Sequence, residues 1–181
     1  MTPAEHLKEE HEGITLMLRI LEKVCVKMEA KEEIDPFDRL EKIMEFFKIF
    51  VDQCHHGKEE DLLFPAITPM EQKLIGLLLR EHSQGRSYVR AMGRELTRMK
   101  KFEGLTWAEF AAHAHKYIAL MIQHIRKEDN VLFPMLDGLL GKKKQMELVE
   151  GFEDLERKKI GEGVHEEFHK LLHELREIYP D

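Results

Sequence analysis

The chain has 181 residues, of which 43% are hydrophobic and 35% are charged, and its formal net charge is −7. This composition is typical of a globular protein and argues against an intrinsically disordered chain. The negative net charge, with only short basic runs such as Lys142–Lys144, argues against a nucleic-acid-binding groove.

Helical periodicity runs through nearly the whole chain, and strand-like alternation is absent. Chain-breaking residues, among them Asp35 with Pro36 and Gly161, interrupt the periodicity at a few places. We predict an all-α protein with helical segments at residues 3–30, 36–65, 69–100, 106–136 and 142–179. Thr106, three residues before Glu109, resembles a capping box at the start of the fourth segment.

The first four segments carry apolar stripes with the three-to-four spacing of helical-bundle cores. A histidine interrupts each stripe, and the second and fourth stripes add a glutamate one turn later. In chain order, these polar interruptions are His11, His55, Glu59, His82, His124 and Glu128.

The second half of the chain repeats the first. HHGKEEDLLFP at residues 55–65 aligns without gaps on HIRKEDNVLFP at residues 124–134, and a Glu-His pair lies upstream of each. Two helical hairpins of one design, packed face to face, predict an up-down-up-down four-helix bundle with pseudo-twofold symmetry.

The second segment contains two overlapping His-x-x-x-Glu pairs, His55 with Glu59 and His56 with Glu60. An α-helix does not turn both pairs inward, because neighbouring side chains point about 100° apart. Ile125 occupies the place of His56 in the second repeat. We therefore expect the first pair to face the interior and the second pair to lie at the flank.

At 1.5 Å rise per residue, the four stripe histidines fall about 12–20 Å from the same end of such a bundle. They would therefore form one layer of the interior, together with the two stripe glutamates. Two buried carboxylates in that layer would repel each other without a cation. Histidine and carboxylate ligands without a thiolate suit iron, manganese or zinc. Two bridging carboxylates would hold two metal ions with two histidines each, and coordination positions would stay open.

With its four histidines, its two His-x-x-x-Glu motifs and the LLFP and VLFP that follow them, the chain resembles the hemerythrin-like family in its HHE-domain form. The resemblance covers about residues 3–137. It implies a four-helix bundle that holds a centre of two non-haem iron ions. It also implies four terminal histidine ligands and two bridging glutamates, namely His11, His55, His82, His124, Glu59 and Glu128.

The sequence departs from the oxygen-carrying members of the family, which have a further histidine one turn after the ligand on the third helix. Arg86 occupies that position here. Those members also end in His-x-x-x-x-Asp, a spacing that His124 and Asp129 fit, so Glu128 and Asp129 both remain open as bridging ligands. The ligand set is more similar to bacterial HHE proteins and to di-iron proteins linked to the repair of iron–sulfur centres.

The resemblance implies a metal-binding protein that takes O₂ or a related small ligand, peroxide or NO, for oxygen or redox sensing or handling. The alternatives are a di-iron peroxidase or oxidase, an iron donor in repair, and a scaffold whose tail recognises a partner. Tyr117 and Gly85 lie on the stripes beside the ligands, either facing the metal cavity or packing as core residues.

We expect residues 1–140 to form the bundle and residues 141–181 to form a helical extension that packs on it, or that contacts a second copy or a partner protein. His165, His169 and His173 lie on this extension, where we expect a solvated or docking face. The chain lacks a membrane-spanning apolar run and a secretion-signal core, so we expect a cytoplasmic protein with free, core-facing Cys25 and Cys54.

Overall fold

The computed structural model describes residues 1–32 and 37–180, so that the expected break at Asp35 and Pro36 lies outside the described part. The described residues form α-helices and π-helical segments, the latter labelled η. In chain order, the elements are α1 (Pro3–Glu29), α2 (Phe37–Glu45), η1 (Phe46–His56), η2 (Glu59–Leu63), α3 (Phe64–Ile67), α4 (Gln72–Lys101), α5 (Ala108–Lys127), η3 (Glu128–Leu132), α6 (Phe133–Leu139), α7 (Lys142–Lys159) and α8 (Val164–Ile178).

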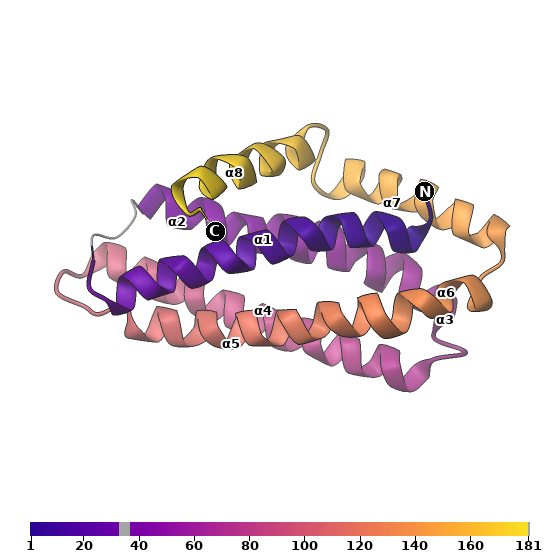
Figure 1. Cartoon of the computed structure of the whole chain (residues 1–181), viewed down its shortest axis with the longest axis horizontal. Coiled ribbons are helices and arrows are strands. Elements are labelled where there is room, and N and C mark those ends of the chain that lie inside the picture. The colour runs from indigo at the N-terminus through magenta and orange to yellow at the C-terminus, as the bar shows by residue number, and fades with distance from the viewer. Residues whose placement is uncertain (33–36, 181) are drawn as a thin grey trace.

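These elements build four long rods that run up, down, up and down (Figure 1). The rods are α1, the run from α2 to α3, α4, and the run from α5 to α6. They match the predicted segments, and the all-α four-helix bundle is confirmed. The predicted capping box is wrong: α5 begins after Trp107, which leaves Thr106 one position too early to cap it.

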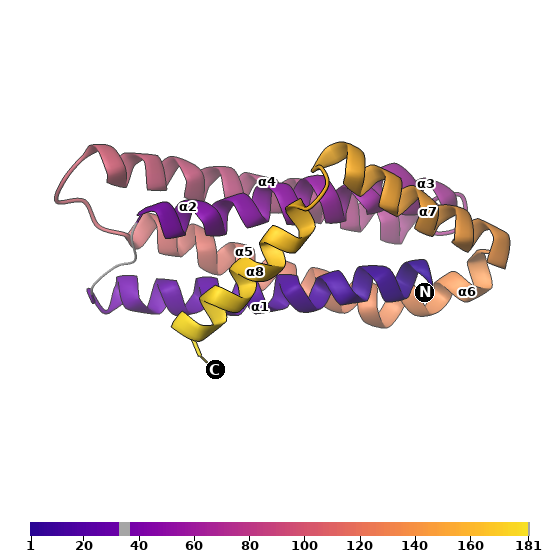
Figure 2. The same cartoon turned by 90° about the horizontal axis from the view of Figure 1, so that it is seen from above.

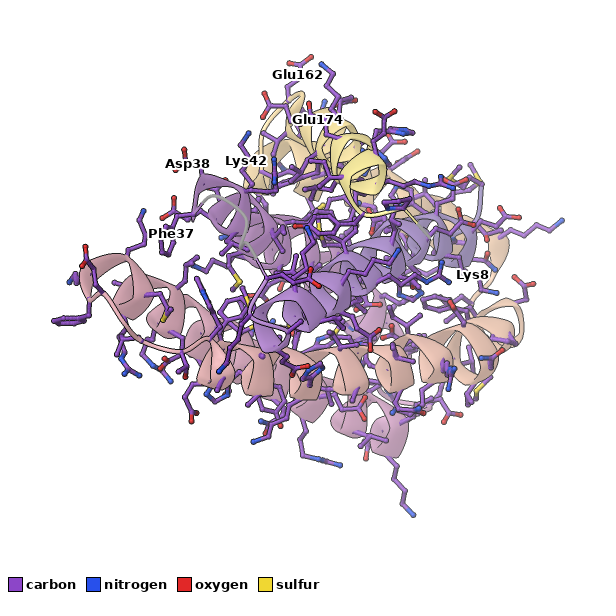
Figure 3. All side chains as sticks on the ribbon, turned by 60° about the vertical axis from the view of Figure 1, so that its left-hand side comes forward. Lys8, Phe37, Asp38, Lys42, Glu162 and Glu174 are labelled. Atoms are coloured by element: carbon purple, nitrogen blue, oxygen red, sulfur yellow. The ribbon has the colours of Figure 1, made fainter. Side chains whose placement is uncertain are left out.

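Residues 142–178 form two helices rather than the single segment expected from the sequence. Gly161 and Gly163 have φ angles of 93° and 84°, a left-handed conformation that other residues adopt only at a cost, and they separate α7 from α8. Figure 2 shows α8 crossing over α1 and the second rod. Glu162, in the connection before α8, and Glu174 of α8 lie on the outer side of the molecule (Figure 3). Phe168 of α8 is instead buried against Phe46, with ring centroids 5.6 Å apart.

The apolar core consists of two clusters, and the histidine layer lies between them. On α1, Leu7 belongs to one cluster and Ile14 to the other, with His11 in between. On α4, Leu78 and Val89 flank His82 in the same way, and the other two rods repeat the arrangement. The layer is therefore enclosed by hydrocarbon on both sides, which lowers its effective dielectric constant.

A proline follows shortly after each of the two short π-helical segments, η2 and η3. Pro65 and Pro134 cannot donate an i→i−4 hydrogen bond, and their rings crowd the carbonyl four residues earlier. The wider turn of η2 and η3, with i→i+5 bonding, accommodates these rings. None of the helices in the described ranges is both long enough and apolar enough to span a membrane.

Candidate metal centre

Four histidines meet as two pairs in the buried layer. The Nε2 atoms of the first pair, His11 and His55, lie 3.1 Å apart. Those of the second pair, His82 and His124, lie 3.0 Å apart. Two nitrogen ligands about 2.1 Å from one metal ion and at right angles to each other are separated by about 3 Å. Each pair therefore has the spacing of two ligands of one ion.

Two glutamates join the pairs. Glu59 places Oε1 3.6 Å from Nε2 of His55 and Oε2 3.3 Å from Nε2 of His82. One carboxylate oxygen of Glu128 lies 3.3 Å from Nε2 of His11, and the other lies 3.2 Å from Nε2 of His124. Each carboxylate thus directs one oxygen toward each histidine pair, which is the arrangement that a bridging ligand needs.

The inner carboxylates fit a cation. Glu59 and Glu128 are 0% exposed, and none of their four oxygens makes a hydrogen bond to the described residues. Burying an ionised carboxylate without compensation costs several kcal/mol, so such groups are normally paired or coordinate a metal. The donor set of imidazole nitrogen and carboxylate oxygen suits iron, manganese or zinc.

The side-chain donor atoms form two overlapping groups, within each of which all donor atoms lie within 4.8 Å of one another. Glu59 belongs to both groups. The first group consists of His11, His55, Glu59 and Glu128, and the second consists of His56, Glu59, His82 and His124. All six residues expected from the sequence are therefore brought together in one layer, and His56 joins them.

Each of the four paired histidines makes a hydrogen bond through Nδ1 to a carboxylate at the edge of the layer, which we call an outer carboxylate. The Nδ1-to-oxygen distances lie between 2.7 and 2.9 Å, and the pairs are His11 with Asp129, His55 with Glu10, His82 with Glu60, and His124 with Glu81. An imidazole that donates from Nδ1 keeps its lone pair on Nε2, which here points into the layer.

The outer carboxylates follow the internal repeat. Glu10 and Glu81 each precede a layer histidine and bind the histidine on the second helix of their own hairpin. Glu60 and Asp129 each follow an inner glutamate and bind a histidine of the other hairpin. The sequence analysis named Glu60 and Asp129 in other roles and did not predict that these four residues bind the histidines, although the acid beside each ligand in both repeats was the available signal.

Glu128 and Asp129 have different places in this geometry. Glu128 is fully buried and faces both histidine pairs, whereas the side chain of Asp129 is 31% exposed and its oxygen accepts from Nδ1 of His11. The geometry favours Glu128 as the residue that contacts a metal.

The family model of the Hemerythrin HHE cation binding domain matches residues 2–136. The chain belongs to this family. Similar proteins include one from Mycobacterium bovis and one from Mycobacterium tuberculosis, both described as uncharacterized. Each is 24% identical to this chain over 165 residues, which cover 90% of this chain and 64% of the relative. The chain therefore spans less than two thirds of the length of these relatives.

Charges inside this HHE domain shift the ionisation of its layer residues. Burial disfavours the charged imidazole of His11, but the hydrogen bond to Asp129 and the adjacent Glu128 carboxylate outweigh it and raise the pKa to about 9. Burial likewise opposes protonation of His124, and the charge of Glu128 raises its pKa to about 10. A cation that bound to these nitrogens would displace such protons.

A buried ion network connects the layer to α7. The Lys58 side chain is 0% exposed, and its Nζ donates to Glu10 and, at 2.8 Å, to Glu156 of α7. Burial opposes ionisation of Lys58, but the charge of Glu10 raises its pKa above the ordinary value. Lys127, the counterpart of Lys58 in the repeat, bonds Glu81 at 2.8 Å, and its side chain is 29% exposed. α7 therefore covers the ion pair of Lys58 and Glu10, whereas the equivalent pair of Lys127 and Glu81 is partly exposed to solvent.

The expectation that His56 lies at the flank is wrong. Its side chain is buried and stacks on His82, with ring centroids 3.8 Å apart and planes at 16°. The physical reason is η1, whose wider turn reduces the angle between neighbouring side chains, so that His55 and His56 both face inward. Glu60 is half-buried, near the expected flank, and binds His82.

Arg86 stands where oxygen-carrying members of the family have a further histidine. Its Nε lies 2.6 Å from Asp52, and its Nη2 lies 2.6 Å from Glu60. Arg86 thus fixes the carboxylate that orients His82. Tyr117 is buried in the core against Phe47, with ring centroids 5.0 Å apart, and it also lines the pocket that reaches His56.

Both cysteines are free and buried, as expected. Burial raises the pKa of each thiol to about 12, which excludes a thiolate at neutral pH. The tail histidines lie away from the layer. His165 and His169 pack edge to face on α8, beside a pocket of about 510 Å³ between α1 and the α7–α8 connection.

Proposed function

We propose that this member of the HHE family is a di-iron protein that binds O₂ or a related small ligand, peroxide or NO, in oxygen or redox sensing or handling. The proposed ligands are His11, His55, Glu59, His82, His124 and Glu128. The observation that carries the proposal is the pair of buried, unbonded glutamates, each with one oxygen toward each histidine pair.

Iron held by nitrogen and carboxylate ligands with open positions supplies a site for small oxygen- and nitrogen-containing ligands. The protein's own groups prepare that site. The outer carboxylates hold the imidazoles in the tautomer that presents Nε2, and Lys58, Arg86 and Lys127 neutralise three of these carboxylates. The two apolar clusters that flank the layer shield it from bulk water along the bundle axis.

Two pockets support access of a small molecule to the layer. One, of about 480 Å³, is lined by His11 and Asp129 together with surface residues of α1. The other, of about 240 Å³, is lined by His56, Gly85 and Tyr117. A Cβ atom added at Gly85 would lie 3.5 Å from the Tyr117 ring, an ordinary contact, so Gly85→Ala narrows this pocket without a clash.

The test is metal content and an optical spectrum of protein purified without air and then exposed to it. We expect about two irons per chain and new near-ultraviolet charge-transfer bands in air. His124→Ala should lose iron and these bands, whereas His115→Ala, which changes an exposed histidine paired with Glu29, should keep both. Absence of iron, or a single zinc ion unaffected by His124→Ala, would refute the proposal.

The same sample separates binding from catalysis. A ligand-binding protein gives a spectral change that reverses when the gas is removed, whereas a peroxidase consumes peroxide over many turnovers. We expect the reversible change.

A further inference from the structure

Two histidines of the tail, His165 and His169, lie one turn apart on one face of α8. Their ring centroids are 4.6 Å apart, and their planes meet at 71°. The two histidine pairs of the layer have nearly the same separations, 4.8 Å and 4.7 Å, at angles of 58° and 59°. The α8 pair therefore has the ring spacing of the pairs in the candidate metal centre.

This spacing suits two ligands of one ion. An ion bound about 2.1 Å from a ring nitrogen lies about 3.2 Å from the ring centroid, so two imidazoles at right angles around it have centroids about 4.5 Å apart. Phe50 packs on the ring of His165 at a centroid distance of 5.3 Å, whereas His169 is exposed and its ring can turn about a soft torsion. Neither ring forms a hydrogen bond with the part of the chain that the structure describes.

The pocket of about 510 Å³ beside this pair is acidic. Two of its glutamates, Glu10 and Glu156, are bound by Lys58, and its single arginine, Arg157, pairs with Asp154. The other lining glutamates form no ion pair with the described residues, and they are Glu9, Glu153, Glu162 and Glu166. Carboxylates without counter-charges give the pocket a negative potential that attracts cations.

One of these carboxylates lies opposite His169. Helices α1 and α8 cross with the same general direction (Figure 2), and they meet at Gly13, where a Cβ atom would lie 3.3 Å from the Leu172 side chain. Glu9 is one turn before Gly13, and His169 is about one turn before Leu172. Both line this pocket and the neighbouring pocket of about 340 Å³. Glu9 is therefore the carboxylate of α1 that is placed to join the two histidines.

From this geometry we propose that His165, His169 and Glu9 form a second metal site, which takes one divalent transition-metal ion and ties α8 to α1. Imidazole nitrogen and carboxylate oxygen suit zinc and similar ions. None of the three residues belongs to the histidine layer, and both histidines lie outside residues 2–136, which the family model matches. The site is therefore independent of the proposed di-iron function.

The test is a calorimetric titration with Zn²⁺ of protein whose layer is already loaded with metal. We expect about one further Zn²⁺ per chain, and His169→Ala should weaken its binding about tenfold or more, because one of two imidazoles is lost. The metal content of the layer should stay unchanged in this variant. His173→Ala is the matched control, since His173 is exposed on the next turn of α8 and does not line the pocket.

A second variant tests the tie between the helices. In the natural protein, saturating Zn²⁺ should raise the midpoint of thermal unfolding, because the ion binds only where α1 and α8 meet. Glu9→Gln keeps the shape of the side chain but removes its charge, and it should lose most of this rise. Glu12→Gln, at an acid that lines only the neighbouring pockets, should keep it.

Three results would overturn the site. They are the absence of a further Zn²⁺, equal affinity for it in His169→Ala, and an unchanged thermal shift in Glu9→Gln. Loss of the ion in His173→Ala but not in His165→Ala would also contradict the proposal, because it would place the ion one turn further along α8.

Discussion

Nδ1 of His55 lies 2.8 Å from a carboxylate oxygen of Glu10, a residue 45 positions earlier in the chain. Burial opposes ionisation of Glu10, but the bond to His55 and the charge of Lys58 lower its pKa to about 2. Glu10 is therefore a permanent anion that both orients a layer histidine and receives the buried Lys58. The ion network thus continues from Glu10 through Lys58 to Glu156 on α7.

The first prediction concerns Glu10. Glu10→Gln keeps the shape of the side chain but removes the charge that fixes and strengthens His55, so metal affinity should fall about 10- to 100-fold. Glu81→Gln, the same change in the second repeat, should have a similar effect. Chelator competition on both variants provides the measurement, and affinities equal to the natural protein would show that these carboxylates do not act through the histidines.

The second prediction compares two lysines that the repeat makes equivalent. Lys58→Met leaves Glu10 and Glu156 without their buried counter-charge, and we expect the free energy of unfolding to fall by about 3–5 kcal/mol. Lys127→Met removes a partly exposed pair with Glu81 and should cost at most about 1 kcal/mol. Urea unfolding of the metal-free proteins measures both. Equal losses of stability in the two variants would mean that burial under α7 does not strengthen the Lys58 ion pair.

The third prediction concerns the attachment of the tail. Phe168 packs edge to face on Phe46 and Phe50, and we expect Phe168→Ala to destabilise the fold by about 3 kcal/mol or more through lost packing. Ile178→Ala, on the exposed end of α8, should cost less than about 0.5 kcal/mol. A small effect at Phe168 in thermal unfolding would instead mean that α8 docks only loosely. The division into residues 1–140 and 141–181 stays a prediction.

The rods and the six layer residues could be predicted because both depend on local periodicity. A histidine on an apolar stripe faces the core wherever the helix is regular. His56 was misplaced because η1 departs from that regularity, and the sequence gives no direct sign of a π-helical turn. The outer carboxylates were missed for another reason: Asp129 and His11 are 118 residues apart, and only the packed bundle joins them.

The last prediction uses Cys25, which lies far from the layer along α1. Burial raises the pKa of this thiol to about 12, whereas in the unfolded chain it ionises near pH 8.5. Between these values the folded protein holds a proton that the unfolded chain releases, so the free energy of unfolding falls as pH rises. The advantage of the natural protein over Cys25→Ala should therefore shrink above about pH 8.5, by up to about 1.4 kcal/mol per pH unit. Urea unfolding of both proteins at pH 7.5 and near pH 10 measures this difference, and a constant difference would show that the thiol reaches solvent in the folded protein.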